Sequence, residues 1–133
     1  MSDQVDAVLA AAKNYVDAKY KEGRNNDTIF GKWYGLNHQP WCAMFVSKCF
    51  AEAKASKLIA AQSSKGFSSC QIGLSWFASK KQLVPVTSAM PGDIVFYQFD
   101  DDPAADHVGI VVSNNKLTKT LITYRSEEHT SEL

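Results

Sequence analysis

Apolar residues recur at three- and four-residue spacing through the first part of the chain, which is typical of one face of an α-helix. The predicted helices cover residues 2–21, 40–55 and 72–80. Ser2 or Asp3 can cap the first helix with a side-chain oxygen, and we expect Gly23 to end it. The second helix carries a wide apolar face. All three helices precede the longer strands that the pattern predicts.

After residue 80 the spacing changes from helical to strand-like. Residues 82–86 predict a short extended piece, which Pro85 confines to a sheet edge because proline lacks an N–H to donate. The longer predicted strands cover residues 93–99, 107–113 and 117–124. Asn114 and Asn115 predict a tight turn between the last two strands. Helices followed by an antiparallel meander indicate an α+β domain.

The length and charge of the chain limit its number of domains and the kinds of partner that it can bind. A chain of 133 residues can form one domain with a substantial core. Hydrophobic residues make up 45% and charged residues 21% of the chain, and the formal net charge is zero. That balance argues against partners bound by global electrostatic attraction, such as nucleic acid or an anionic membrane. The first residues lack a signal-peptide pattern and no apolar run spans a membrane, so we expect a cytoplasmic, soluble protein.

Three cysteines, Cys42, Cys49 and Cys70, limit the redox and metal chemistry. No pair has the CxxC spacing that zinc sites use, so a zinc site is not expected. Cys42 and Cys49 lie two helical turns apart, about 10 Å, which is too far for a disulfide within one straight helix. An odd count leaves at least one thiol free if any disulfide forms.

Cys42 is the candidate nucleophile. Pro40 fits the first turn of the predicted helix, where its missing N–H costs nothing, so Cys42 lies close to the helix N-terminus. Unpaired N–H groups and the helix dipole favour an anion there, and a thiolate is such an anion. A cysteine in this place can have a pKa well below the ordinary value of about 8.5. The alternative is that Cys42 is a small buried hydrophobe, as free cysteines commonly are.

His107 opens a predicted strand after a polar loop, a position from which its side chain can project from the sheet edge. Taken alone, such a residue is more often an ordinary surface histidine. As a partner for Cys42, it would be the base that a cysteine nucleophile needs within hydrogen-bond reach. Gly109 lies on the same face, and its missing side chain lets another backbone or a substrate approach.

Three short motifs in this order resemble the CHAP family, the cysteine- and histidine-dependent amidohydrolases and peptidases. They are WCAMFV at 41–46, PGDIVF at 91–96 and HVGIV at 107–111. The resemblance runs from roughly Val5 to Tyr124 and implies a papain-like α+β fold. It implies cleavage of an amide bond in bacterial peptidoglycan, either the N-acetylmuramoyl-L-alanine bond or a peptide bond. A catalytic domain at the N-terminus without a signal peptide most resembles a phage endolysin, which stays in the host cytoplasm until it is released to the cell wall.

The resemblance also implies roles for individual residues. Cys42 is expected to form a thioester with the acyl half of the cleaved bond, and His107 to pair with the thiolate and then protonate the leaving amine. The backbone N–H of Cys42 is expected in the oxyanion hole. The second donor is Gln39 or Asn37, between which the sequence does not choose. Trp41 is expected to line the substrate groove, with core packing as the alternative.

Residues 24–39 predict a polar loop that contains aromatic anchors and turns at two glycines. The anchors are Phe30, Trp33 and Tyr34, and the glycines are Gly31 and Gly35. The resemblance implies that Trp33 and Tyr34 line the groove. Packing against the following helix is the alternative for this loop.

The chain departs from the family near its C-terminus. CHAP domains usually orient the histidine with a third polar residue on the next strand, here expected near Tyr124, but Arg125 follows. Residues 125–133 match the in-frame translation of a widely used sequencing-adapter oligonucleotide. We therefore interpret 1–124 as the CHAP catalytic domain, 125–133 as a non-native tail, and the third catalytic residue as lost by truncation. We expect a correctly shaped domain with weakened activity; the alternative is a silent peptidoglycan-binding module on the same fold.

No metal and no organic cofactor is expected. Some CHAP domains bind calcium through closely spaced aspartates before the cysteine, but the matching stretch here, residues 25–27, is Asn-Asn-Asp with one carboxylate. Calcium takes about six to eight oxygen ligands. The expected partner is bacterial peptidoglycan, with no nucleic acid and no membrane, and the chain is expected to be a monomer.

Overall fold

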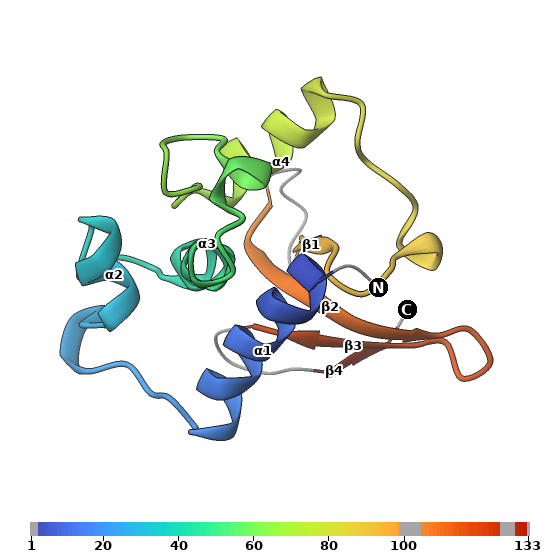
Figure 1. The fold of residues 1–133 in the computed structure, drawn as a ribbon, viewed down its shortest axis with the longest axis horizontal. Helices are drawn as coiled ribbons and strands as arrows, with labels where there is room; N and C mark the ends of the chain where they lie inside the picture. Colours follow the sequence, from blue (N-terminus) through green and yellow to red (C-terminus); the bar gives the residue numbers. More distant parts are fainter. Residues whose placement is uncertain (1–2, 99–104, 126–129, 133) are drawn as a thin grey trace.

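Helices precede the strands in the fold, as the sequence predicts (Figure 1). The computed structural model describes residues 3–98, 105–125 and 130–132. Within these residues the helices are α1 (Asp3–Asp17), α2 (Ile29–Tyr34), α3 (Cys42–Glu52) and α4 (Cys70–Ser79). The strands are β1 (Ile94–Tyr97), β2 (His107–Asn115), β3 (Thr120–Tyr124) and β4 (Thr130–Glu132). The predicted α+β class is confirmed.

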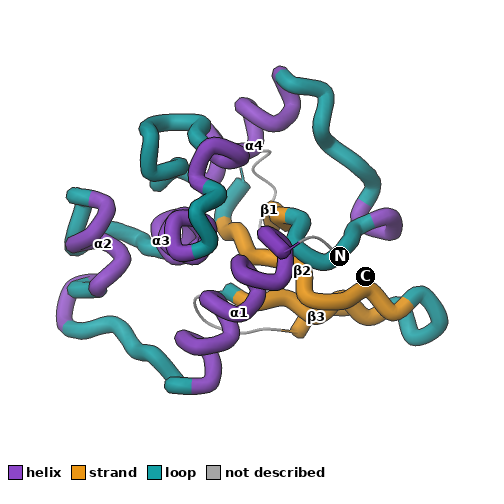
Figure 2. Tube along the Cα trace, in the orientation of Figure 1, coloured by secondary structure: helices purple, strands orange, loops and turns teal. Residues whose placement is uncertain are grey.

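The described strands form one antiparallel sheet in the order β1–β2–β3–β4. Tyr97 of β1 lies opposite His107 of β2. The end of the β2–β3 hairpin projects away from the helices (Figure 2). The predicted meander is therefore present, although Phe99, the predicted end of its first strand, lies outside the described residues. β4 falls within the segment interpreted above as a tail, and it pairs with β3.

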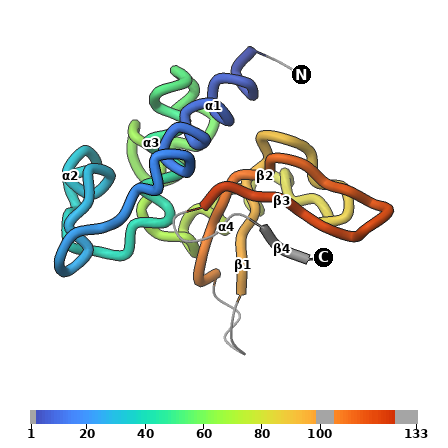
Figure 3. Tube along the Cα trace, turned by 90° about the horizontal axis from the view of Figure 1, so that it is seen from below, coloured from blue at the N-terminus to red at the C-terminus, as the bar shows by residue number. Residues whose placement is uncertain are grey.

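α3 is the central helix, in contact with α1, α2 and β2. Figure 3 shows α1 beside α3, with both helices to one side of the sheet. The largest fully buried side chains of the core come from several elements and include Phe30, Met44, Ile59, Phe67 and Ile110. Burial of these side chains from helices and strand alike fixes the position of α3, and hence of its first residue, relative to β2.

Three helices end with a lysine in the left-handed conformation. Lys19, Lys54 and Lys81 have φ angles of 54°, 58° and 58°. After α1, the N–H of Tyr20 bonds to the carbonyl of Tyr15 at 3.1 Å, which is the closing bond of a Schellman motif. The prediction that Gly23 ends the first helix is wrong, because α1 stops at Asp17. The prediction assumed that a glycine takes the left-handed position, and a lysine takes it here.

The predicted start of the second helix is wrong, whereas the predicted cap of the first is tested only for Asp3. Asp3 is the first residue of α1, and Ser2 lies outside the described residues. Trp41 is the N-cap of α3, so Pro40 lies before the helix and not in its first turn. Cys42 nevertheless lies at the helix N-terminus, as its first residue.

The predicted loop at 24–39 contains α2, which the sequence pattern does not predict. Thr28 caps this helix by accepting a hydrogen bond from the N–H of Gly31 at 2.9 Å. Gly35 ends it with a φ of 97°, a conformation that favours glycine. A helix of 6 residues is too short to show the three- and four-residue repeat on which the prediction depends.

Two predictions in the second half of the chain are wrong. Residues 82–86 form no strand, and Pro85 instead precedes a short 3-10 turn. β2 continues through Asn114 and Asn115, so the turn of the hairpin lies at 116–119. The side-chain oxygen of Asn115 accepts two backbone N–H bonds from that turn and shapes it from the strand end.

Candidate active site

Cys42 is the first residue of α3, and its side chain is half-buried. The N-cap, Trp41, offers no side-chain hydrogen bond to the first turn of the helix. The N–H of Ala43 donates to the Cys42 sulfur. Because the first N–H groups of a helix have no carbonyl partner within it, they and the helix dipole stabilise an anion at this sulfur.

A second cysteine lies against the first, a contact that the sequence does not predict. Cys70 is the first residue of α4, and its sulfur lies 3.4 Å from the sulfur of Cys42. Ser69 caps α4 by accepting a hydrogen bond from the N–H of Ile72 at 3.2 Å. Two helix N-termini therefore meet at the pair of sulfur atoms.

Several contacts hold the segment that leads into Cys70. The hydroxyl of Ser47 on α3 donates to the carbonyl of Phe67 at 2.8 Å and accepts from its N–H at 3.1 Å. The ring of Phe67 lies where a Cβ on Gly73 of α4 would come within 2.7 Å of it, so α4 packs closely on this ring. The side-chain carbonyl of Gln62 accepts hydrogen bonds from the N–H groups of Ser68 and Ser69. Together these bonds fix α4 against α3.

His107 is the first residue of β2 and lies opposite Tyr97, with 6.0 Å between the ring centroids. Just before it, the N–H of Ala105 donates to the side-chain oxygen of Gln71 on α4 at 2.8 Å. The N–H of Asp106 donates to the Tyr97 carbonyl, also at 2.8 Å. The first bond ties the segment before β2 to the helix N-terminus that carries the second cysteine, and the second ties it to the end of β1.

The surroundings lower the pKa of the Cys42 thiol well below its ordinary value of about 8.5. A hydrogen bond from the Cys70 thiol has the largest effect, and burial acts against it. The side chain of His107 adds a hydrogen bond and its charge, and the N–H of Ala43 adds a further hydrogen bond. The same sulfur contact, together with burial, raises the pKa of Cys70. The surroundings therefore favour the thiolate on Cys42 and the protonated thiol on Cys70.

Cys49, two turns further along α3, is an ordinary core residue. Its side chain is fully buried, and burial raises the pKa of its thiol. All three cysteines are free thiols, in keeping with the expectation that Cys42 and Cys49 cannot pair within one helix.

Trp41 belongs to the aromatic core. It is 7% exposed, and its ring stacks on Phe30 at 5.2 Å with edge contacts to Tyr20 and Phe45. The packing alternative is therefore the one that the structure supports for this residue.

Trp33 and Tyr34 of α2 are half-buried at the surface. The ammonium groups of Lys48 and Lys65 lie 5.6 Å and 5.5 Å from the centre of the Trp33 ring. The hydroxyl of Tyr34 accepts a hydrogen bond from Ser63 at 3.2 Å. Their place in a substrate groove stays a prediction.

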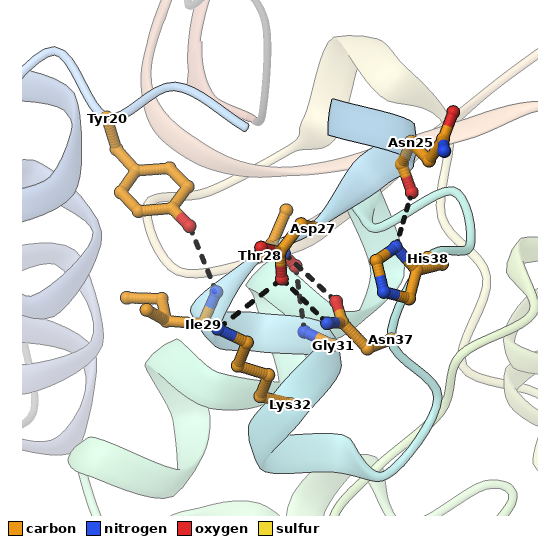
Figure 4. Close-up of polar contacts among 9 residues, drawn as sticks. All are labelled: Tyr20, Asn25, Asp27, Thr28, Ile29, Gly31, Lys32, Asn37 and His38. Carbon is orange, nitrogen blue, oxygen red and sulfur yellow. Dashed lines mark hydrogen bonds and ion pairs between the residues drawn. The ribbon is translucent and has the colours of Figure 1, made fainter. Parts of the chain in front are cut away.

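The two candidate oxyanion donors differ in their surroundings; Figure 4 shows those of Asn37. The side-chain oxygen of Asn37 accepts from the N–H of Thr28 at 3.0 Å, and its nitrogen donates to Asp27 at 2.7 Å. Asn37 thereby closes the loop that leads into α2. Gln39 is exposed and lies three residues before Cys42.

Arg125 lies directly after β3, where the resemblance predicts an orienting residue near the strand end. Its side chain is 6% exposed, and the guanidinium carbon lies 4.4 Å from the centre of the Tyr97 ring. A Cβ on Gly109 would come within 3.1 Å of the Cβ of Arg125, which confirms a close approach at this glycine. His107 and Arg125 therefore border the same aromatic ring. Residues 126–129 and 133 of the predicted tail lie outside the described residues.

An apolar pocket of about 460 Å³ lies between α4, β1 and the segment that joins them. Its lining includes Leu74, Phe77, Leu83 and Ile94, and none of the predicted site residues. Among the residues that the structure describes, no three histidine, cysteine or acidic side chains gather as metal ligands would. No helix in the described part of the chain has the length and apolar character needed to cross a membrane.

Comparison with known proteins identifies the family. The family model described as CHAP domain matches residues 33–126, a region that includes α3, α4 and strands β1 to β3. No curated protein and no solved structure matches the chain. CHAP domains are in general cysteine- and histidine-dependent amidohydrolases, and the family implies hydrolysis of peptidoglycan. Since the matched region covers more than half of the chain and holds both Cys42 and His107, the chain belongs to the CHAP family.

Proposed function

We propose that this chain hydrolyses an amide bond of bacterial peptidoglycan, with Cys42 as the nucleophile and His107 as its acid–base partner. The observation that carries the proposal is the thiol at the start of α3, whose pKa is lowered by Cys70, by His107 and by a backbone N–H. The thiolate, and not the thiol, attacks a carbonyl carbon. A sulfur held as an anion at neutral pH is prepared for acyl transfer, which a buried core thiol is not.

The reaction takes place in two halves. The Cys42 thiolate adds to the amide carbonyl carbon, and the carbonyl oxygen takes up the negative charge. His107 then gives its proton to the amide nitrogen as the C–N bond breaks, so the amine leaves and a thioester remains. Water next attacks the thioester and loses a proton to His107. The acid product departs, and the Cys42 thiolate is regenerated.

The oxyanion of the intermediate needs hydrogen-bond donors. The backbone N–H of Cys42 is the first, because it belongs to the N-terminal turn of α3. We propose Gln39 as the second. The amide of Asn37 is already held by Thr28 and Asp27, whereas Gln39 is exposed just before the nucleophile.

We further propose that the chain acts as a lysin of the phage type, which reaches the cell wall from the host cytoplasm. Family membership supports peptidoglycan as the substrate class. An N-acetylmuramoyl-L-alanine amidase and a peptidoglycan endopeptidase both break amide bonds, so the same pair of residues serves either reaction. The masses of the released fragments distinguish the two.

A second candidate is a peptidoglycan-binding module with little or no hydrolysis. The observation that favours it is Arg125, whose guanidinium borders the same Tyr97 ring that the His107 ring borders. A guanidinium has donors but no hydrogen-bond acceptor, so it cannot accept the N–H of an imidazole and orient the ring as a carboxylate or amide oxygen does. We propose that 125–133 is a non-native tail and that Arg125 stands where the parent domain has an orienting residue.

Digestion of purified peptidoglycan tests the proposal. The chain, a Cys42→Ala variant and a Cys49→Ala control are incubated with cell-wall sacculi, and soluble fragments are weighed by mass spectrometry. We expect the unchanged chain and Cys49→Ala to produce new free amines in the peptidoglycan, and Cys42→Ala to produce none. An N-terminal L-alanine marks an amidase, and other new termini mark an endopeptidase. Sedimentation of the chain with sacculi without any fragments would support the second candidate and contradict the first.

A further inference from the structure

We propose that Cys70 is a resolving cysteine: when hydrogen peroxide oxidises Cys42, Cys70 closes a reversible disulfide with it and switches the site off. The starting observation is the 3.4 Å between the two sulfur atoms. Inhibition by this disulfide rests on the proposed function of Cys42. Formation of the disulfide depends only on the geometry of the pair.

The two sulfur atoms already lie close to bonding range. A disulfide has a sulfur–sulfur distance of about 2.05 Å, so the two atoms must approach by about 1.3 Å. Each cysteine is the first residue of its helix. The bonds from Ser47 to Phe67 keep the α4 start against α3 while the sulfurs approach.

The choice of residue at position 70 carries the argument further. As a hydrogen-bond donor to the Cys42 thiolate, a serine would serve as well as a cysteine, because a hydroxyl donates more strongly than a thiol. Only a thiol can also form a covalent bond with an oxidised Cys42. The third cysteine, Cys49, is fully buried two turns along α3 and does not share this contact.

The chemistry balances with hydrogen peroxide as the oxidant. The Cys42 thiolate attacks one peroxide oxygen and the O–O bond breaks, which leaves a sulfenic acid on Cys42 and releases hydroxide. Oxidation removes the negative charge of Cys42, whose contact is the largest cause of the raised Cys70 pKa, so Cys70 gives up its proton more readily and its sulfur attacks the sulfenic sulfur. A sulfur–sulfur bond forms, the sulfur–oxygen bond breaks, and the hydroxyl leaves as water with the proton of Cys70.

Proximity decides the fate of the sulfenic acid. Without a neighbouring thiol, further peroxide converts it to a sulfinic acid, which ordinary thiols do not reduce. Cys70 is already in contact with the reacting sulfur and is 9% exposed, so it competes with peroxide at close range while being shielded from oxidation itself. The disulfide therefore protects the Cys42 sulfur from irreversible loss.

Peptide mapping after peroxide treatment tests the inference on the full chain. Reduced protein is freed of reductant and treated with hydrogen peroxide, remaining thiols are alkylated, and digests are analysed with and without dithiothreitol. We expect one linked peptide pair that joins Cys42 to Cys70, with Cys49 alkylated as a free thiol. Hydrolysis of peptidoglycan should fall by roughly tenfold or more, because a disulfide has no thiolate, and should return with dithiothreitol.

Two variants sharpen the test. Cys70→Ser keeps a hydrogen-bond donor but cannot resolve a sulfenic acid, so its Cys42 should appear as sulfinic acid and dithiothreitol should restore nothing. Cys49→Ala should behave as the unchanged chain. Sulfinic acid on Cys42 of the unchanged chain while Cys70 stays reduced would overturn the inference, as would a disulfide that joins two chains or involves Cys49. The map of the unchanged chain decides this even if Cys70→Ser fails to fold.

The two proposals can fail separately. A Cys42–Cys70 disulfide in a chain whose reduced form releases no peptidoglycan fragments would remove the enzymatic proposal and leave the resolving pair. Fragment release by the reduced chain, with no intramolecular disulfide after peroxide, would do the opposite.

Discussion

The sulfur atoms of Cys42 and Cys70 lie 3.4 Å apart, and each residue begins a helix. The contact is unequal, because it lowers the pKa of Cys42 and raises the pKa of Cys70. The contact therefore favours a thiolate at Cys42 and a protonated thiol at Cys70. This contact makes Cys70 a positioning residue for the nucleophile of the proposed reaction.

Removing the donor should raise the pKa of Cys42. A hydrogen bond to a charged group is worth about 1.5–3 kcal/mol, so Cys70→Ala is expected to raise the Cys42 pKa by about 1 to 2. Cys70→Ser, which keeps a donor, should leave the Cys42 pKa low. Ultraviolet absorbance of the thiolate during a pH titration measures both. An unchanged Cys42 titration in Cys70→Ala would show that His107 and the helix N-terminus suffice.

Ser47 should matter for stability although it has no part in the proposed reaction. Its hydroxyl satisfies both the N–H and the carbonyl of buried Phe67, so Ser47→Ala leaves these groups without that partner. The expected loss is about 1–3 kcal/mol in the free energy of unfolding, measured by urea denaturation. Ser64→Ala, at an exposed position, is the matched control and should change stability by less than about 0.5 kcal/mol. Equal stability of the two variants would contradict the role assigned to the Ser47 contacts.

The stability losses of Trp41→Ala and Trp33→Ala should distinguish a core residue from a surface residue. Trp41 is buried against Phe30, so Trp41→Ala should cost about 3–5 kcal/mol of stability. Trp33 is half-buried under two lysine ammonium groups, and Trp33→Ala should cost clearly less. Thermal unfolding of both variants measures the difference. If Trp41→Ala were stable but bound peptidoglycan poorly, the result would contradict the core role and support a place for Trp41 in the substrate groove.

Replacing Arg125 should increase hydrolysis. Arg125→Asn removes the cation beside the Tyr97 ring and places an amide directly after β3, where we propose that the orienting residue was lost. In a serine triad the orienting group is worth about 10⁴ in turnover, so even a partial return should raise the rate roughly tenfold. The initial rate of fragment release measures it, with Lys116→Asn on the exposed hairpin turn as the control for charge. A rate unchanged or lowered by Arg125→Asn, in a folded protein, would speak against a lost third residue.

The sequence predicts Cys42 and His107 at the starts of their elements because those starts are local features. A polar loop followed by an apolar repeat marks each one. The contact between Cys42 and Cys70 is different. It depends on the path of the loop between α3 and α4, which folds back against α3. Gly66 in this loop has a φ of 126°, and a Cβ on it would lie 2.5 Å from the hydroxyl of Ser47 on α3. No local pattern encodes that return.

The errors in the helix prediction concern helix ends and one short helix. The prediction looked for glycine at helix ends, whereas Lys19, Lys54 and Lys81 take the left-handed position here. α2 is shorter than two turns and shows no repeat, and Thr28 caps it from within a stretch that reads as polar loop. The predicted fold class and the predicted order of the strands are nevertheless correct, because they depend on longer stretches of sequence than any single helix end.

The reactivity of the three thiols tests the central claim, that Cys42 is an activated nucleophile, most directly. Iodoacetamide labelling is followed across pH for Cys42, Cys49 and Cys70 by peptide mass spectrometry. Because the Cys42 pKa is lowered, its thiolate should persist as the pH falls and be lost only as the pH passes through that lowered value. Cys42 alone should therefore label fast at about pH 6, below the ordinary thiol pKa of about 8.5, and His107→Ala should slow it. Slow labelling of all three, rising only near the ordinary thiol pKa, would contradict the claim.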